Sequence, residues 1–383
     1  MTAFLVSVSA LNLQAQDKKN MFNPVNTAAV FMNIAPDARS GAMGDVGVST
    51  EADANSQYWN PAKYPFNIAR AGVAANYTPW LRKLVNDINL ANLAGFYRIG
   101  DYSAVSGSLN FFSLGDVFLS EAEDAMTINP YEMSLDVGYS RMLSETFSMG
   151  VALRFIYSDI KYDYTAESSA GKAFAADIAM YHNGYLMLGN RECSLGWGLN
   201  VSNIGSKISY GGDDHAEFIP TNLRLGATLT VPIDEYNKFS FTAEANKLLV
   251  PTEPKQEEGE KTNDYLARLD REYYDISPIS GIFKSFHDAP GGFKEEMEEV
   301  QWSIGAEYTY NDRFSLRAGY HHESENKGNR KYFTAGAGFK MNIFSIDAAY
   351  VFSTSQSNPL DQTMRFTLGF DLDGLQELFS TRR

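Results

Sequence analysis

The sequence is poor in the residues from which small catalytic and metal centres are built. It contains one cysteine, Cys193, so it forms no internal disulfide, and it has no CxxC motif or Cys/His cluster. GxSxG and HExxH are missing, and no Ser/His/Asp arrangement can be read. Histidines in the clusters 213–215 and 321–322 have no metal-ligand spacing, and we interpret them as solvated loop residues. The sequence therefore predicts neither a cofactor nor an enzyme.

Basic residues and long apolar runs are also scarce. The chain has 32 Lys and Arg against 47 Asp and Glu, and its net charge of −15 argues against nucleic-acid binding. Beyond its first 13 residues, no apolar run reaches the roughly 18 residues of a transmembrane helix. Aromatic residues are abundant at 13%. Such a chain fits an outer-membrane β-barrel or a periplasmic enzyme.

The first residues predict export. The run 3–13 is strongly apolar, and Leu13-Gln14-Ala15 resembles a signal-peptidase site, followed by polar residues. We interpret 1–16 as a signal peptide, although no Lys or Arg precedes the apolar run.

Alternation of polar and apolar residues distinguishes the two classes. In 221–231, Leu223, Leu225 and Leu229 share one face, while Arg224 and Thr228 share the other. This period of two extends over the 9–11 residues that a tilted spanning strand needs. Fourteen segments have this pattern, although twelve strands remain an alternative because the first few are less regular. They are 70–77, 88–98, 102–113, 131–142, 147–160, 173–185, 194–202, 221–231, 238–249, 300–310, 314–321, 331–340, 343–352 and 364–372.

The connections between these segments alternate between long and short. The segments 99–101, 143–146, 232–237, 311–313 and 341–342 are short, 186–193 is intermediate, and the others are longer, up to 250–299. Outer-membrane barrels have short periplasmic turns, long extracellular loops and periplasmic termini. We therefore predict an all-β, fourteen-stranded antiparallel transmembrane β-barrel over 70–372, with a periplasmic tail at 373–383.

The segment before the first strand predicts a plug inside the barrel. Residues 39–64 are rich in small residues, with Gly41, Gly44 and Gly47 at three-residue spacing and a turn at Asn60-Pro61. We expect 17–69 to enter the lumen; the alternative is a disordered periplasmic lead-in. The residues expected in the plug are Arg39, Gly41, Met43, Gly44, Asp45, Tyr58, Trp59, Asn60 and Pro61.

The two faces of the strands predict a polar lumen and a lipid-facing exterior. Charges on the lumenal face are expected to form a structural network; they are Asp136, Arg154, Asp177, Arg224, Glu244, Glu307, Arg317, Lys340, Arg365 and Asp371. Aromatic residues near the outward strand ends predict interfacial girdles.

Three loop segments are too apolar for ordinary solvated loops. The segment 80–88 has helical spacing of apolar residues, 262–274 predicts a short helix, and 277–286 predicts another with Ser277-Pro278 at its start. These helices either cap the lumen or form a docking surface. The residues expected to bind a partner are Trp80, Leu81, Leu84, Ile279, Ile282, Phe283 and Phe286. The acidic run 295–299 is interpreted as a solubilising flank.

The lead-in and the barrel resemble the FadL-like family of fourteen-stranded outer-membrane proteins. In that family a glycine-rich segment beginning with Ala-Arg precedes an Asn-Pro-Ala turn, and the matching residues are Ala38, Arg39, Gly41, Met43-Gly44 and Asn60-Pro61-Ala62. Within it, the chain is most similar to the PorV (LptO) family of the type IX secretion system, through residues 33–45 and 58–63.

The resemblance implies a non-enzymatic shuttle in the outer membrane of a Gram-negative bacterium, of the Bacteroidetes. Such a barrel binds cargo proteins by their C-terminal secretion domain as they leave a large translocon barrel. It passes them to a sortase-containing surface complex that attaches them to lipopolysaccharide. Two alternatives remain: a FadL-like transporter of hydrophobic small molecules, and a lipopolysaccharide hydrolase using His321 with a neighbouring serine.

Overall fold

Fourteen antiparallel strands close into a barrel. The computed structural model describes residues 22–83, 85–119, 126–160, 169–211, 215–257, 259–341, 343–353 and 360–372. Each wall strand pairs with its neighbours in sequence, and β1 closes the barrel by pairing with β16, with Ala74 opposite Gly369. The wall strands are β1 (Ala71–Pro79), β2 (Asn89–Ile99), β3 (Ser103–Ser113), β6 (Tyr131–Met142), β7 (Phe147–Asp159), β8 (Gly171–Leu188), β9 (Arg191–Gly205), β10 (Asn222–Pro232), β11 (Asn237–Leu248), β12 (Gln301–Tyr310), β13 (Phe314–His322), β14 (Lys331–Lys340), β15 (Phe344–Ser353) and β16 (Met364–Asp371).

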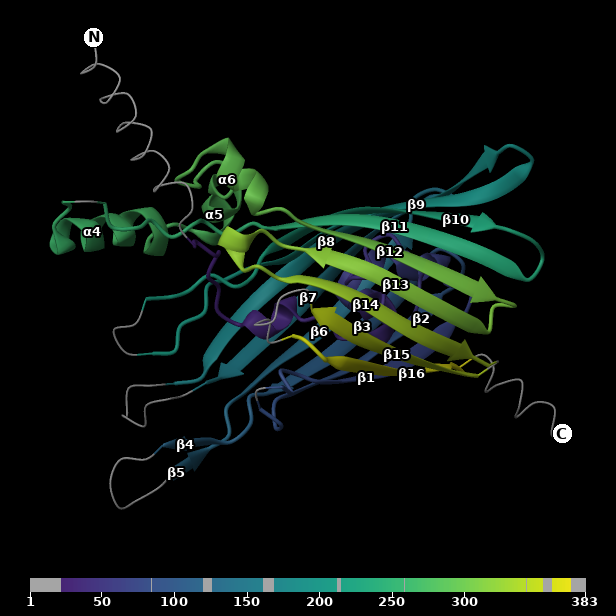
Figure 1. Ribbon diagram of the computed structural model, residues 1–383, viewed down its shortest axis with the longest axis horizontal. Coiled ribbons are helices and arrows are strands. Elements are labelled where there is room, and N and C mark those ends of the chain that lie inside the picture. Colours follow the sequence, from purple (N-terminus) through teal and green to yellow (C-terminus); the bar gives the residue numbers. More distant parts are fainter. Residues whose placement is uncertain are drawn as a thin grey trace, which may run out of the picture.

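The two ends of the barrel differ, as the sequence predicts. One end, the short-turn end, has connections such as the two-residue turn between β8 and β9. The other, the long-loop end, has the small sheet of β4 (Val117–Leu119) and β5 (Met126–Ile128), and the helices α4 (Thr262–Leu269), α5 (Pro278–Lys284) and α6 (Phe293–Glu298). These elements gather at one end of the barrel in Figure 1, where a π-helical turn, Asp270–Tyr274, continues α4.

The barrel wall is polar inside and apolar outside. Along β12, Gln301 and Ser303 are buried toward the lumen, while Trp302 and Ile304 are exposed on the outer surface. An outer face of exposed apolar side chains around a polar interior is typical of barrels whose outer surface meets lipid. Among the described residues, no helix is long and apolar enough to span a membrane.

The N-terminal segment runs through the barrel. Its first described residues lie at the long-loop end, where the Phe22 carbonyl accepts a hydrogen bond from Lys255 and the Asn23 amide donates to Asn326. From there a 3-10 turn (Val30–Asn33), α2 (Ala38–Gly41), α3 (Ser56–Trp59) and a second 3-10 segment (Pro61–Phe66) lead toward β1. Figure 1 shows this segment in purple within the strands. The segment therefore passes from the long-loop end to the short-turn end, where the Asn67 carbonyl accepts from Arg98 just before β1 begins.

Other differences from the predictions have local causes. The predicted helix at 80–88 is wrong: Leu81 has a φ of 50°, which interrupts a helix, and one bond from Val85 N to Leu81 O closes a single turn. The prediction of an intermediate connection at 186–193 is also wrong, because β8 and β9 extend into this segment and leave a two-residue turn. The sheet of β4 and β5 was not predicted. The signal peptide 1–16 and the tail 373–383 lie outside the described residues.

Candidate functional site

The plug is a compact unit with its own hydrogen bonds. Asp37 caps α2 by accepting from the Ser40 amide (2.8 Å), and it accepts from the Trp59 indole (2.6 Å), which joins α2 to α3. Asn60 accepts from the Ala62 amide and donates to the Val48 carbonyl (2.9 Å). The Asn-Pro-Ala turn thus stabilises the segment that enters the second 3-10 helix.

Ion pairs connect the plug to the barrel wall. The Arg39 guanidinium binds Glu307 of β12 (3.0 Å) and Asp53 of the plug itself (3.1 Å). Asp45 pairs with Arg365 of β16 and accepts from the Tyr332 hydroxyl (2.6 Å). Each buried charge of these pairs therefore has a partner, which offsets the cost of burying it.

Glycines in the wall make room for the plug. A Cβ on Gly198 of β9 would lie 2.1 Å from the Val48 carbonyl oxygen, and one on Gly319 of β13 would lie 2.0 Å from the Met43 carbonyl carbon. In the plug itself, Gly44 has a φ of +76° and faces the Tyr320 backbone. The plug backbone therefore packs directly on the wall.

The nine residues expected in the plug all lie within this unit. They are Arg39, Gly41, Met43, Gly44, Asp45, Tyr58, Trp59, Asn60 and Pro61, and among them Arg39, Asp45 and Tyr58 are half-buried and the others buried. Arg224 of β10 lies 4.7 Å from the Trp59 ring centroid and donates to the Tyr58 hydroxyl. Glu244 of the neighbouring strand β11 pairs with Arg224 (3.4 Å) and accepts from the Gly47 and Val48 amides, so β10 and β11 together hold this part of the plug.

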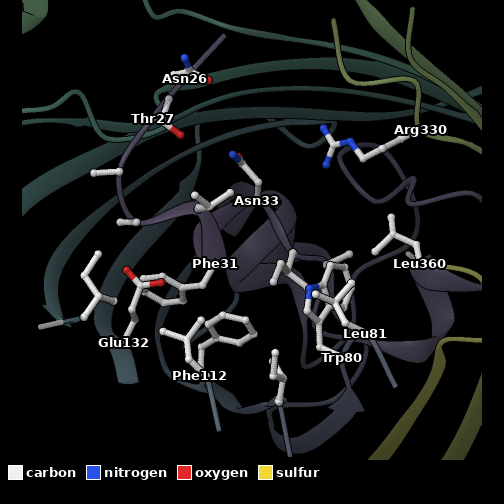
Figure 2. Close-up of a pocket in the computed structure, with 18 of the residues that line it drawn as sticks. Asn26, Thr27, Phe31, Asn33, Trp80, Leu81, Phe112, Glu132, Arg330 and Leu360 are labelled. Carbon is white, nitrogen blue, oxygen red and sulfur yellow. The ribbon is translucent and has the colours of Figure 1, made fainter. Parts of the chain in front are cut away.

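A cavity of about 600 Å³ lies above the plug at the long-loop end. Its walls include Phe31 and Phe112, whose rings are nearly parallel with centroids 6.4 Å apart, as Figure 2 shows. Trp80 and Leu81 also line it, so these two predicted docking residues face the cavity. Leu84 lies outside the described residues.

Phe112 and Glu132 were not predicted as functional residues. Phe112 follows Ser108 and Asn110 on the inward-facing side of β3. An apolar residue in this otherwise polar series could have indicated a binding site from the sequence. Phe31 has no such signal, because only the passage of the N-terminal segment through the barrel brings it beside Phe112.

The second candidate surface is the outer face of α5 and α6. Ser277 caps α5 by accepting from the Ser280 amide, as predicted. The side chains of Ile279, Phe283 and Phe286 are 55%, 68% and 49% exposed, whereas Ile282 is half-buried. On α6, Phe293 and Met297 are exposed as well. We call Ile279, Phe283, Phe286, Phe293 and Met297 the loop patch.

The acidic run 295–299 anchors this loop, so its interpretation as a solubilising flank is wrong. Lys327 pairs with Glu295 (2.7 Å) and Glu299 (3.0 Å), and Lys247 of β11 pairs with Glu296 and Glu299. Nearby, burial beside acidic neighbours raises the pKa of Asp288 to about 6. These pairs tie α6 to two other parts of the long-loop end.

His321 is also not a solvated residue. It is 6% exposed, faces the lumen, lies 2.9 Å from the Ser303 hydroxyl and stacks on Tyr332. The adjoining cavity has a volume of only about 40 Å³, enough for water but not for an acyl chain. Among the described residues, no group of acidic, His and Cys side chains has the arrangement of a metal site.

Solved structures show the same fold. The Pseudomonas putida toluene transporter TodX matches with a TM-score of 0.53 and 12% identity, over 87% of this chain and 97% of that chain. A Pseudomonas aeruginosa FadL homologue matches with a TM-score of 0.42 and 12% identity, over 91% and 99% of the two chains. The Ralstonia pickettii toluene transporter TbuX matches with a TM-score of 0.45 and 11% identity, over 87% of this chain and 97% of that chain. Comparison with curated protein sequences finds no match.

The TodX match and the strand order give the class of fold, a closed β-barrel of fourteen antiparallel strands. A family model described as type IX secretion system protein PorV matches residues 14–255, which is more than half of the chain. The chain belongs to the PorV family. The family and the fold support a place in the outer membrane, and in outer-membrane barrels long loops are extracellular and short turns periplasmic.

Proposed function

We propose that this barrel is a docking and shuttle protein of the type IX secretion system, and not an enzyme. The observation that carries the proposal is the contrast between its two sides. The plug packs on the lumenal wall through Gly198 and Gly319, which disfavours passage through the barrel. The loop patch, in contrast, presents five exposed apolar side chains to the extracellular side. Exposed apolar clusters of this kind mark binding surfaces.

The loop patch has the properties of a preformed interface. Gly281 packs α5 closely on Phe218 and Pro251, and the ion pairs of Lys327 hold α6. A held aromatic surface loses little conformational entropy on binding, and buried aromatic side chains dominate interface energies.

Family membership supports the identity of the partners. In this proposal the loop patch binds secreted cargo through the C-terminal secretion domain, at a large translocon barrel. The protein then delivers cargo to a sortase-containing attachment complex, where lipopolysaccharide is the acceptor. The outer membrane is that of a member of the Bacteroidetes.

A second candidate function is transport of hydrophobic small molecules. The cavity of about 600 Å³ above the plug, with Phe31, Phe112 and Trp80 in its wall, favours it. The size is within the range of small-molecule sites. Transport would also require the plug to move away from the wall at Gly198 and Gly319.

Affinity purification from gently solubilised outer membrane tests the docking function. We expect the wild-type barrel to recover a very large barrel and secreted proteins that share a C-terminal domain. A Phe283→Ser/Phe286→Ser variant should lose most of this recovery, because two exposed aromatic anchors are removed. Ile68→Ser is the matched control, since Ile68 is 99% exposed but lies on the periplasmic side, before β1.

The two functions give different outcomes. Recovery of the barrel alone, with a bound apolar small molecule, would support transport. Equal recovery by wild type and the double variant would show that the loop patch is not the docking surface.

A further inference from the structure

The wall of the extracellular cavity has an excess of negative charge. Glu132, Glu217 and Glu253 line it, and in the described part of the chain none of the three forms an ion pair. Glu132 is 5% exposed, and from the described residues it accepts one hydrogen bond, a neutral one from Ser158 (2.7 Å). Figure 2 shows its carboxylate beside Phe31.

The cations near the cavity do not balance these carboxylates. Arg330, on the side opposite Glu132 in Figure 2, donates twice to Glu323, at 2.8 Å each. Arg365 is paired with Asp45. Both guanidinium groups are therefore already neutralised.

Glu217 accepts a hydrogen bond from the Tyr274 hydroxyl, and His215 and, more strongly, Lys207 act on it from a distance. The Lys207 ammonium donates to the carbonyls of Tyr273 and Tyr274 and lies 3.9 Å from the Phe218 ring centroid. Glu253 receives only a long contact from the Asn26 amide, at 3.5 Å. The three carboxylates thus remain open to a cation from outside.

We infer that this cavity binds an apolar group that carries a positive charge, provided by a lysine- or arginine-bearing apolar segment of a secreted protein. Phe31, Phe112, Trp80 and Leu81 supply the apolar contact, and Glu132, Glu217 and Glu253 supply the partners that a desolvated cation needs. The identity of the source as a protein segment rests on the proposed function; the preference for a cation rests on the cavity alone.

A matched series of amphiphiles tests the charge preference. The full barrel in lipid nanodiscs is titrated with decylamine, decanol and decanoate, which share one chain. We expect the amine to bind at least about tenfold more tightly than the alcohol, because its ammonium forms charge-assisted hydrogen bonds. Glu132→Gln should remove most of this preference and leave alcohol binding unchanged. Glu253→Gln is the second variant if Glu132→Gln fails to fold, and Glu145→Gln, in the exposed turn before β7, is the control.

Two results would overturn the inference: decanoate binding most tightly, or all three amphiphiles binding equally. The source is tested with an apolar peptide containing lysine and its counterpart with norleucine. A preference of about tenfold for the lysine peptide supports a protein segment. Binding of decylamine without any peptide preference would refute the protein source.

These results are separable from the docking function. Phe283→Ser/Phe286→Ser should leave the amine preference intact, because neither residue lines the cavity. If docking is lost and the amine preference is intact, the cavity inference stands. If docking is confirmed and the amine preference is absent, the cavity inference alone is rejected.

Discussion

Replacing Gly319 with alanine should dislodge the plug from the wall. The new Cβ would lie 2.0 Å from the Met43 carbonyl carbon and 2.2 Å from the Gly44 nitrogen. Ordinary contact needs about 3.4 Å, so the plug backbone would have to move by roughly an ångström or more. It is held there by Thr334, which accepts from the Gly44 amide and donates to the Ala42 carbonyl, each at 2.8 Å.

The expected cost is at the upper end of overpacking effects, about 3 kcal/mol. Gly95→Ala is the control, because its Cβ would lie 3.1 Å from the Val73 side chain and 3.2 Å from the Gly72 carbonyl oxygen, which needs a shift of only a few tenths of an ångström. Without a serious clash, alanine in a strand gains roughly 0.5–1 kcal/mol over glycine. Denaturant unfolding of both purified variants in micelles, with protease access to the plug, measures the difference. A Gly319→Ala barrel as stable as Gly95→Ala would refute direct packing of the plug on the wall.

Three further predictions concern the long-loop end. Asp288→Asn should slow hydrogen exchange of the Thr252 amide, which donates to Asp288, at pH 7.5 but not at pH 4. The pKa of Asp288 in the folded protein is about 6, above the usual 3.8, so the folded protein loses stability as the pH rises from about 4 to 6 and no more above that. Asparagine carries no charge and removes this loss. Lys327→Met should destabilise the loop by about 3 kcal/mol, because Glu299 loses one partner of a buried pair, and urea-dependent proteolysis of the loop measures this. An epitope tag inserted before Phe22 should bind antibody on intact cells, since Phe22 is 62% exposed at the extracellular end; labelling only after lysis would contradict the path of the segment.

The wall was predictable because its physics is local. A strand between lipid and a polar lumen must alternate, so 221–231 and 300–310 predict β10 and β12 within a residue at each end. The plug was predictable in position, since its small residues and Asn60-Pro61 turn suit a packed segment.

The path of the N-terminal segment was not predictable, because it depends on contacts between distant residues. Arg39 and Glu307 are 268 positions apart, and Asn23 and Glu295 are 272 apart. The run 295–299 looks solvated in sequence, because its partners Lys247 and Lys327 lie on other elements. A pattern of neighbouring residues in the sequence cannot predict contacts between residues this far apart.

The central claim is that cargo or translocon contacts the loop patch, and site-specific photo-crosslinking in living cells tests it most directly. A photoreactive residue replaces Phe283, with the same substitution at Ile68 as the control. We predict that the probe at Phe283 captures a secreted protein with a C-terminal secretion domain or a very large outer-membrane barrel, and that the probe at Ile68 captures neither. Absence of both adducts at Phe283, in a barrel that is inserted and folded, would contradict the docking account.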